Sequence, residues 1–310
     1  MKKPAIATVL ALLCAGASAD LVVGIMPAIN SVPLVVAEEK GYFAGEGVRV
    51  RLELFQSQMS REAALQSHAI DATVSDLINA IQGWSRGADT MVASATEGSF
   101  GLLTSPGSQL RDLDGWKRLG GRKVPTGLVE ASIVFFVTER VLAAAGIDPG
   151  CVRLVPIVQV PARLEMLLAG KVEAACLPEP LAALAVAQGA RLIADSDSLG
   201  TTPGVMLFTR RALAGKHAEI AAFYRAYNRA VAEVNSNPQA SISAIVARCG
   251  FPPAVRGILK LSRFRPAFVP SEADVMDVSA WMREKGLIGA LPGYADIVLD
   301  SFVRTDARTP

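Results

Sequence analysis

Apolar and polar positions along the chain form short blocks that predict strands alternating with helices. Runs rich in Val, Ile and Leu are followed by segments whose apolar residues recur at helical spacing. Strands are expected at 21–26, 48–55, 70–74 and 90–95, with helices at 32–41, 60–67 and 76–86. A second series gives strands at 122–124, 152–157, 172–177 and 191–194, with helices at 131–145, 162–168 and 181–188. Such alternation predicts βαβ units and mostly parallel sheets flanked by helices, which is an α/β fold.

The remainder of the chain is predicted to be largely helical. A strand at 204–208 is followed by polar, Gly- and Pro-containing breaks that separate helical stretches. Helices are expected at 219–235, 239–248, 254–260, 272–285 and 294–302.

The two αβ series resemble each other. Residues 48–73 and 152–175 each read as a strand, a polar loop with Gln, a short helix and a second strand. Leu65 precedes Asp71 by the same interval as Leu167 precedes Glu173. The repetition predicts two similar lobes, although a single doubly wound domain also fits the alternation.

Composition fits a folded chain of two lobes. The 310 residues are 51% hydrophobic and 19% charged, which is too apolar for a disordered chain. The net charge of +2 shows no strong basic excess, so we expect no nucleic-acid partner.

Residues 1–19 read as a cleavable signal peptide. Lys2 and Lys3 precede a short apolar stretch, and Ala17-Ser18-Ala19 forms a small-residue cleavage site before Asp20. We therefore predict export to the periplasm. Lipid anchoring at Cys14 is the less favoured alternative, because the bulky Leu13 stands before it.

Cysteine and histidine content gives no metal site or cofactor site. Cys151, Cys176 and Cys249 are an odd set after cleavage, and the predicted strands hold the first two too far apart for a bond, so free buried thiols are expected. The chain has two histidines and lacks phosphate-loop and Gly-x-Ser-x-Gly patterns. We expect no metal, no cofactor and no catalytic residues.

Several stretches resemble a known family. They are LVVGIMPAINSVPLVVAEEKGYFAGEGVRVRL (21–52), with its Ala-Glu-x-x-Gly-Tyr-Phe run, then 110–115, 143–147, 167–174 and Glu179-Pro180. They are similar to the nitrate/sulfonate/taurine and thiamine-precursor family of ABC-transporter solute-binding proteins. The resemblance implies a two-lobed periplasmic binding protein of the second type, with the ligand cleft between lobes. It implies lobe one at 20–104 plus 204–310 and lobe two at 105–203, with crossings near 104–106 and 201–204.

The resemblance also implies a function. The chain would capture a small-molecule ligand by clamshell closure and deliver it to an inner-membrane ABC permease with a separate ATPase subunit. It would act as a monomer and not as an enzyme. A ligand-sensing subunit for a membrane sensor kinase, or an enzyme on the same fold, are the alternatives.

Relatives hold their ligand with residues in the turns after strands, where helix N-termini offer free N–H groups. Carried onto this sequence, the candidates are Met26, Asn30, Ser57, Gln58, Ser75, Asp76, Thr96 and Glu97 in lobe one and Thr126, Glu130, Ser132, Gln159 and Glu179 in lobe two. Pro178 stands where relatives often carry Trp, which weighs against a planar aromatic ligand at that wall.

The acids among these candidates bear on the ligand. If two or more of Asp76, Glu97, Glu130 and Glu179 face the cleft, a simple anion is disfavoured, because buried charges need partners. Arg163 is the one base that the sequence places nearby. We therefore expect a small polar organic nutrient with a nitrogen donor, such as a pyrimidine precursor, or an alkyl sulfonate or taurine-like zwitterion.

Overall fold

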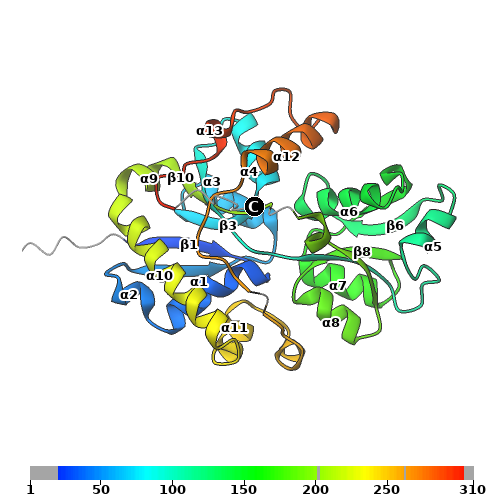
Figure 1. Cartoon of the computed structure of the whole chain (residues 1–310), viewed down its shortest axis with the longest axis horizontal. Coiled ribbons are helices and arrows are strands. Elements are labelled where there is room, and N and C mark those ends of the chain that lie inside the picture. The colour runs from blue at the N-terminus through cyan, green and yellow to red at the C-terminus, as the bar shows by residue number, and fades with distance from the viewer. Residues whose placement is uncertain (1–19, 201–202, 262, 304–310) are drawn as a thin grey trace, which may run out of the picture.

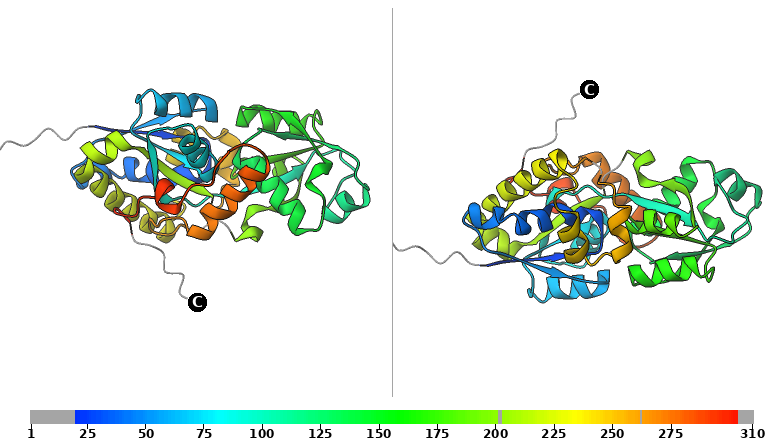
Figure 2. Two further views of the ribbon diagram at one scale, coloured as in Figure 1. Left: turned by 90° about the horizontal axis from the view of Figure 1, so that it is seen from above. Right: turned by 90° about the horizontal axis from the view of Figure 1, so that it is seen from below.

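Two mixed sheets, each flanked by helices, build two lobes that lie side by side (Figures 1 and 2). The structure is a computed structural model that describes residues 20–200, 203–261 and 263–303. The predicted signal peptide, 1–19, lies outside the described residues. The first sheet has the strand order β2 (Val50–Leu54), β1 (Leu21–Ile25), β3 (Ala72–Asp76), β10 (Gly204–Thr209), β4 (Thr90–Ala95). The second has the order β7 (Val152–Pro156), β6 (Val124–Leu128), β8 (Ala174–Pro178), β5 (Phe100–Thr104), β9 (Arg191–Asp195).

The helices follow the strands as the alternating pattern predicts. Lobe one carries η1 (Ile29–Ser31), α1 (Val32–Glu39), α2 (Tyr42–Gly45), α3 (Gln58–Gln66) and α4 (Leu77–Ser85). Lobe two carries α5 (Leu113–Arg118), α6 (Ile133–Ala144), η2 (Pro149–Cys151), α7 (Val160–Leu168), α8 (Leu181–Ala187) and η3 (Ser196–Leu199). The C-terminal part adds α9 (Arg210–Gly215), α10 (His217–Ser236), α11 (Ile242–Arg248), η4 (Pro253–Gly257), α12 (Glu272–Glu284) and α13 (Tyr294–Ile297). The helices predicted at 254–260 and 294–302 are therefore shorter, as η4 and α13.

The two lobes share one topology, as the repetition in the sequence predicts. In the first sheet β1 pairs in parallel with β2 and β3, and in the second sheet β6 pairs in parallel with β7 and β8. In each sheet an antiparallel strand, β10 or β5, then lies between the third strand and an edge strand, β4 or β9. The bounds of β2, α3 and β3 become those of β7, α7 and β8 when 102 is added to each residue number (50 + 102 = 152, 58 + 102 = 160, 72 + 102 = 174).

Each sheet receives its antiparallel strand from the other half of the chain. β5 leaves the first half to pair with β8 and β9, and β10 leaves the second half to pair with β3 and β4. The sequence-based boundary at 104/105 assigns β5 to lobe one, whereas its strand pairing places it in the second sheet. By sheet membership the chain crosses at 96–99, between β4 and β5, and the limits of any parts that move as units stay a prediction.

The C-terminal helices cover lobe one. α10 packs on α1 and α2, where the Phe223 ring stacks on Phe43 with centroids 5.6 Å apart. α12 packs on α4. Burying these apolar faces supplies most of the stability of such helices.

The three cysteines of the described residues are buried and free, as predicted. Within those same residues no helix is long and apolar enough to cross a membrane.

The two crossing segments lie against each other, and this contact requires a glycine. Thr96 N donates to Gly204 O at 2.8 Å, and a Cβ on Gly204 would lie 2.8 Å from the backbone oxygen of Thr96. A contact that short with backbone cannot be relieved by a side-chain rotation.

We expect Gly204→Ala to lower the free energy of unfolding by about 2 kcal/mol, because the added methyl group overpacks this crossing. Urea unfolding measures the change. Gly107→Ala is the matched control, since a Cβ there meets nothing within 4 Å. Equal unfolding midpoints for the two variants would contradict the prediction.

Candidate functional site

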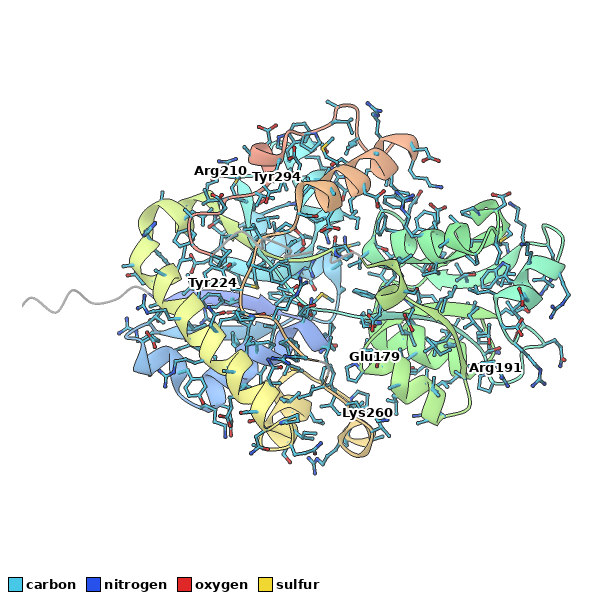
Figure 3. All side chains as sticks on the ribbon, in the orientation of Figure 1. Glu179, Arg191, Arg210, Tyr224, Lys260 and Tyr294 are labelled. Carbon is cyan, nitrogen blue, oxygen red and sulfur yellow. The ribbon has the colours of Figure 1, made fainter. Side chains whose placement is uncertain are left out.

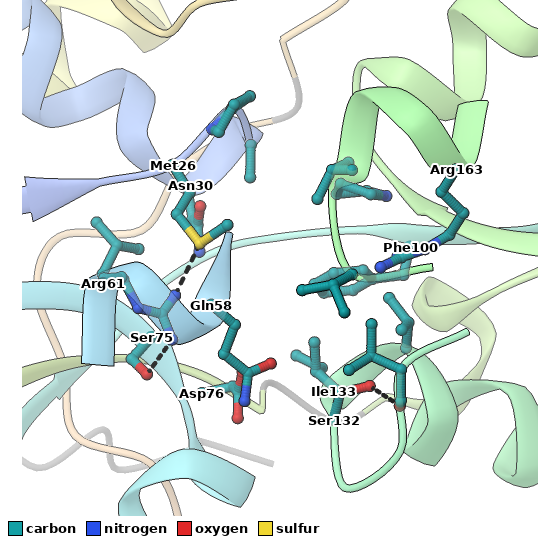
Figure 4. Close-up of a pocket in the computed structure, with 18 residues that line it drawn as sticks. Met26, Asn30, Gln58, Arg61, Ser75, Asp76, Phe100, Ser132, Ile133 and Arg163 are labelled. Atoms are coloured by element: carbon teal, nitrogen blue, oxygen red, sulfur yellow. Dashed lines mark hydrogen bonds between the residues drawn. The ribbon is translucent and has the colours of Figure 1, made fainter. Parts of the chain in front are cut away.

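A cavity of about 90 Å³ lies between the two lobes, at the carboxyl ends of the parallel strands (Figure 4). Open parallel sheets bind ligands at this edge. Both lobes contribute to its wall, which combines a few polar groups with an apolar surface. The lining residues are Met26, Pro27, Ala28, Asn30, Gln58, Arg61, Val74, Ser75, Asp76, Phe100, Val129, Ser132, Ile133, Val134, Val158, Val160, Arg163 and Pro178.

Helix N-caps place two of the polar groups. Asp76 ends β3 and caps α4 by accepting from Asn79 N at 2.9 Å. Ser132 caps α6 by accepting from Phe135 N, and its hydroxyl donates to Val129 O. Asp and Ser are favoured at these positions because their oxygens accept from otherwise unpaired backbone N–H groups. The local fold thus brings both side chains to the cavity.

Arg61 lies on the lobe-one wall and has a carboxylate partner. The residue is 4% exposed. Its Nη2 donates to Ser75 Oγ at 3.0 Å and pairs with Glu62 Oε1 at 2.7 Å. Its Nη1 contacts Met26 Sδ at 3.0 Å, and Figure 4 shows Arg61 together with Met26 and Ser75 beside the cavity. The charge of Arg61 is therefore balanced within lobe one.

Arg163 occupies the matching place in lobe two (61 + 102 = 163) but has no carboxylate partner in the part of the chain that the structure describes. It is 2% exposed. Its Nε and Nη2 donate to Ile157 O at 3.2 and 3.0 Å, and its Nη1 donates to Cys176 O at 3.1 Å. Burial lowers the pKa of Arg163 to about 10, so the group stays cationic at neutral pH. Among the described residues it forms no ion pair, which leaves a buried positive charge beside the cavity.

The lobe-one wall also offers acceptors. Asn30 Oδ1 is buried without a hydrogen-bond partner within the described part of the chain. Burial raises the pKa of Asp76 to about 6, while the nearby Arg61 charge and the Asn79 N–H oppose that rise. Gln58 Nε2 donates to Asn79 Oδ1 at the same wall. Lobe one therefore presents acceptor oxygen atoms beside the paired Arg61, and lobe two presents the Arg163 guanidinium and the Ser132 hydroxyl.

A direct bond joins the lobes at the edge of the cavity. Ile29 N in η1 donates to Glu179 O of lobe two at 3.0 Å. Figure 3 shows Glu179 at the boundary between the lobes. Its carboxylate accepts from Ala183 N at 3.2 Å, and burial raises its pKa. The two walls are thus in contact in this conformation.

The predicted site residues divide into two groups. Six line the cavity: Met26, Asn30, Gln58, Ser75, Asp76 and Ser132. The other seven lie elsewhere. Ser57 caps α3, Glu97 pairs with Arg265, and Glu179 caps the start of α8. Thr96 is buried at the crossing, Thr126 is buried within β6, and Glu130 and Gln159 are exposed.

The sequence-based argument against a simple anion required two or more of the four acids to face the cleft, and the structure does not place two of them there. Of the four acids considered, only Asp76 lines the cavity. The reason is local: Glu97 has an arginine partner from the C-terminal segment, and Glu179 is used by its own helix. An anionic ligand is therefore not disfavoured on this ground.

Sequence reasoning missed Arg61 and the apolar wall formed by Phe100, Ile133, Val134, Val158 and Val160. Arg61 carried a usable signal, because the similarity of 48–73 to 152–175 pairs it with Arg163. The apolar residues carried none, since they read as ordinary core positions.

Comparisons with known proteins agree with this architecture. The sequence profile of the NMT1-like family matches residues 15–249. No curated protein sequence matches the chain.

Among solved structures, the alkanesulfonate-binding protein SsuA from Xanthomonas axonopodis pv. citri, bound to MOPS, superposes with a TM-score of 0.76 at 22% identity, covering 91% of this chain and 99% of that one. A ligand-binding component of an ABC-type import system from Staphylococcus aureus, with zinc bound, gives 0.78 at 15% identity, covering 91% and 97%. The periplasmic nitrate-binding protein NrtA from Synechocystis PCC 6803 gives 0.69 at 14% identity, covering 87% and 82%. These likenesses confirm the predicted fold of a two-lobed periplasmic binding protein.

The raised pKa of Asp76 should make the free energy of unfolding depend on pH. Stability from the neutral carboxyl is fully present below the unfolded pKa, near 3.8, and is lost as the pH rises through about 6. Between pH 4 and 7.5 the wild type should therefore lose about 2 kcal/mol relative to Asp76→Asn, because part of the full effect has already been lost at pH 4. Urea unfolding at each pH tests this, with the exposed Asp114→Asn as control. Parallel stability curves for wild type and Asp76→Asn would contradict it.

Proposed function

The chain belongs to the NMT1-like family, and we propose that it is the extracytoplasmic solute-binding component of an ABC importer. The observation that supports this most is the cavity shared by two lobes, with a buried Arg163 on one wall that forms no ion pair with any residue the structure describes. Such a charge is stabilised by an anionic group that enters from solution. The fold, whose solved examples include transport-binding proteins, supports the same function.

The chemistry of the walls suggests the class of ligand. An anionic group would lie near Arg163, and a donor N–H or O–H group would lie near Asn30 and Asp76. Phe100 and the valines would contact an apolar middle. We therefore propose a small organic anion or zwitterion, such as an alkyl sulfonate or a taurine-like molecule, in preference to a pyrimidine precursor.

Capture would proceed by lobe closure. A ligand that contacts both walls binds the closed form more tightly than the open form, and so shifts the population toward closure by that difference in affinity. Ser132 and Arg163 would supply the lobe-two contacts, and Asn30, Gln58 and Asp76 those of lobe one. The closed protein would then dock on an inner-membrane permease, whose separate ATPase drives transport.

Ligand identity can be tested on protein purified from periplasm without denaturation. Native mass spectrometry should show a bound small molecule that is lost on denaturation, and its exact mass distinguishes a sulfonate from a pyrimidine. Where no ligand is retained, a thermal-shift screen with taurine, alkane sulfonates, nitrate and an aminopyrimidine follows. Absence of any retained mass and of any shift would contradict the proposed function.

Arg163 should be required for affinity. We expect Arg163→Met to weaken binding of the ligand found above by about tenfold or more, because a charge-assisted contact is lost. Isothermal titration measures this on protein whose fold is verified by circular dichroism. The exposed Arg153→Met is the control. Unchanged affinity in folded Arg163→Met would limit Arg163 to holding the Ile157 and Cys176 carbonyl groups.

Export is tested separately. Periplasmic protein should begin at Asp20, because cleavage is expected after Ala19. Intact-mass measurement of the secreted chain checks this, and a mass that includes a diacylglyceryl group on Cys14 would establish the lipid-anchored alternative.

A further inference from the structure

Helix α12 contacts lobe two through residues that do not line the cavity. The segments on both sides of α12 are fixed to strand β4 of lobe one. Ala95 N donates to Phe268 O at 2.6 Å before the helix, and Leu299 N donates to Val92 O at 2.8 Å after it. The helix also packs on α4 of the same lobe. α12 therefore belongs to lobe one, which holds the chain on both sides of the helix.

The far side of α12 packs against α6 of lobe two (Figure 1). Trp281, 3% exposed, meets the rings of Phe135 and Phe136 edge-on, with centroids 5.9 and 5.3 Å apart. Edge-to-face pairs of this kind add to the stabilisation that burial gives. The contact is thus a packed interface between two lobes.

A buried carboxylate, that of Glu139, also joins α6 to α12. Glu139 of α6 is 6% exposed, and both of its carboxylate oxygens bind α12. Trp281 Nε1 donates to Oε2 at 2.7 Å, and Lys285 Nζ pairs with Oε1 at 2.7 Å. All hydrogen bonds described for the Glu139 side chain therefore come from the other lobe. Separation of the helices would leave this carboxylate without its partners.

A further ion pair lies beside these contacts. Arg140 Nη2 pairs with Asp277 Oδ1 at 2.6 Å, and the Arg140 guanidinium lies over the Phe136 ring. Consecutive residues of α6, Glu139 and Arg140, thus bind opposite charges on α12.

The same α6 forms part of the cavity wall. Its N-terminal residues Ser132, Ile133 and Val134 line the cavity, while Phe135, Phe136, Glu139 and Arg140 contact α12. A helix is stiff over this length, so holding one face fixes the position of its start. We propose that α12 is a connection between the lobes in addition to the two crossing segments, which restricts their relative movement and so positions the lobe-two wall of the cavity. Trp281 and Lys285 are positioning residues in this device, and they act through Glu139.

Lobe distances measured without ligand test the proposal. Spin labels are introduced at Met59 in α3 and Met166 in α7 as Met59→Cys and Met166→Cys, both exposed, while the chain's described cysteines are buried. Pulsed electron resonance then gives the distribution of label distances. We expect one narrow peak in the otherwise wild-type protein and loss of that narrow peak, with a broader distribution, in Glu139→Ala.

A second variant guards against misfolding. Trp281→Phe combined with Lys285→Met keeps the aromatic packing but removes both donors to Glu139, and it should broaden the distribution in the same way. Glu284→Gln, on the exposed side of α12, is the matched control and should leave the peak unchanged. Folded variants that keep the wild-type distribution overturn the proposal. The distance measurement uses no ligand. A failure to find a ligand would therefore count against the proposed function but would not change the outcome of this test of α12.

Discussion

The exchange of one antiparallel strand between the two halves is the constraint on which this molecule depends. β5 completes the second sheet and β10 the first, so neither sheet is whole without chain from the other half. Both crossing segments must then pass the same boundary, and their backbones meet at Thr96 and Gly204. That boundary holds the strand ends of both sheets facing each other, and the cavity forms between them.

The repeated topology makes one difference between the lobes informative. Arg61 and Arg163 occupy matching positions in matching helices, and both are buried. Arg61 has Glu62 as its partner, whereas Arg163 is held by backbone carbonyl groups. The surrounding fold is the same in both lobes, and in lobe one it accommodates an arginine that has a carboxylate partner. The fold alone therefore does not explain why Arg163 forms no ion pair with a described residue. Use by a bound anion is the reason we favour.

The sequence predicted the architecture well and the site only in part. Alternating blocks located most strands and helices, because strands buried on both faces read as short apolar runs and helices show apolar residues at helical spacing. β5 was missed because 100–104 is a short apolar run, and its antiparallel partners β8 and β9 lie far away in the chain. Polar residues after strands were read as ligand contacts. Asp76 and Ser132 line the cavity while also capping helices, but the side chains of Ser57 and Glu179 accept from backbone N–H groups in the first turns of α3 and α8 and do not line the cavity. Sequence alone does not separate these uses, since the same oxygen atoms suit both.

The C-terminal part shows how a binding fold can set its own flexibility. Two crossing segments by themselves allow lobes to bend and twist. Adding α12, with both of its flanks on β4 and its outer face on α6, removes part of that freedom without entering the cavity. A protein that binds by closing loses less conformational freedom on binding when its lobes are already restrained. Glu139 and Trp281 would therefore influence affinity through the number of lobe orientations that a ligand must select among, while Arg163 would influence it through direct contact.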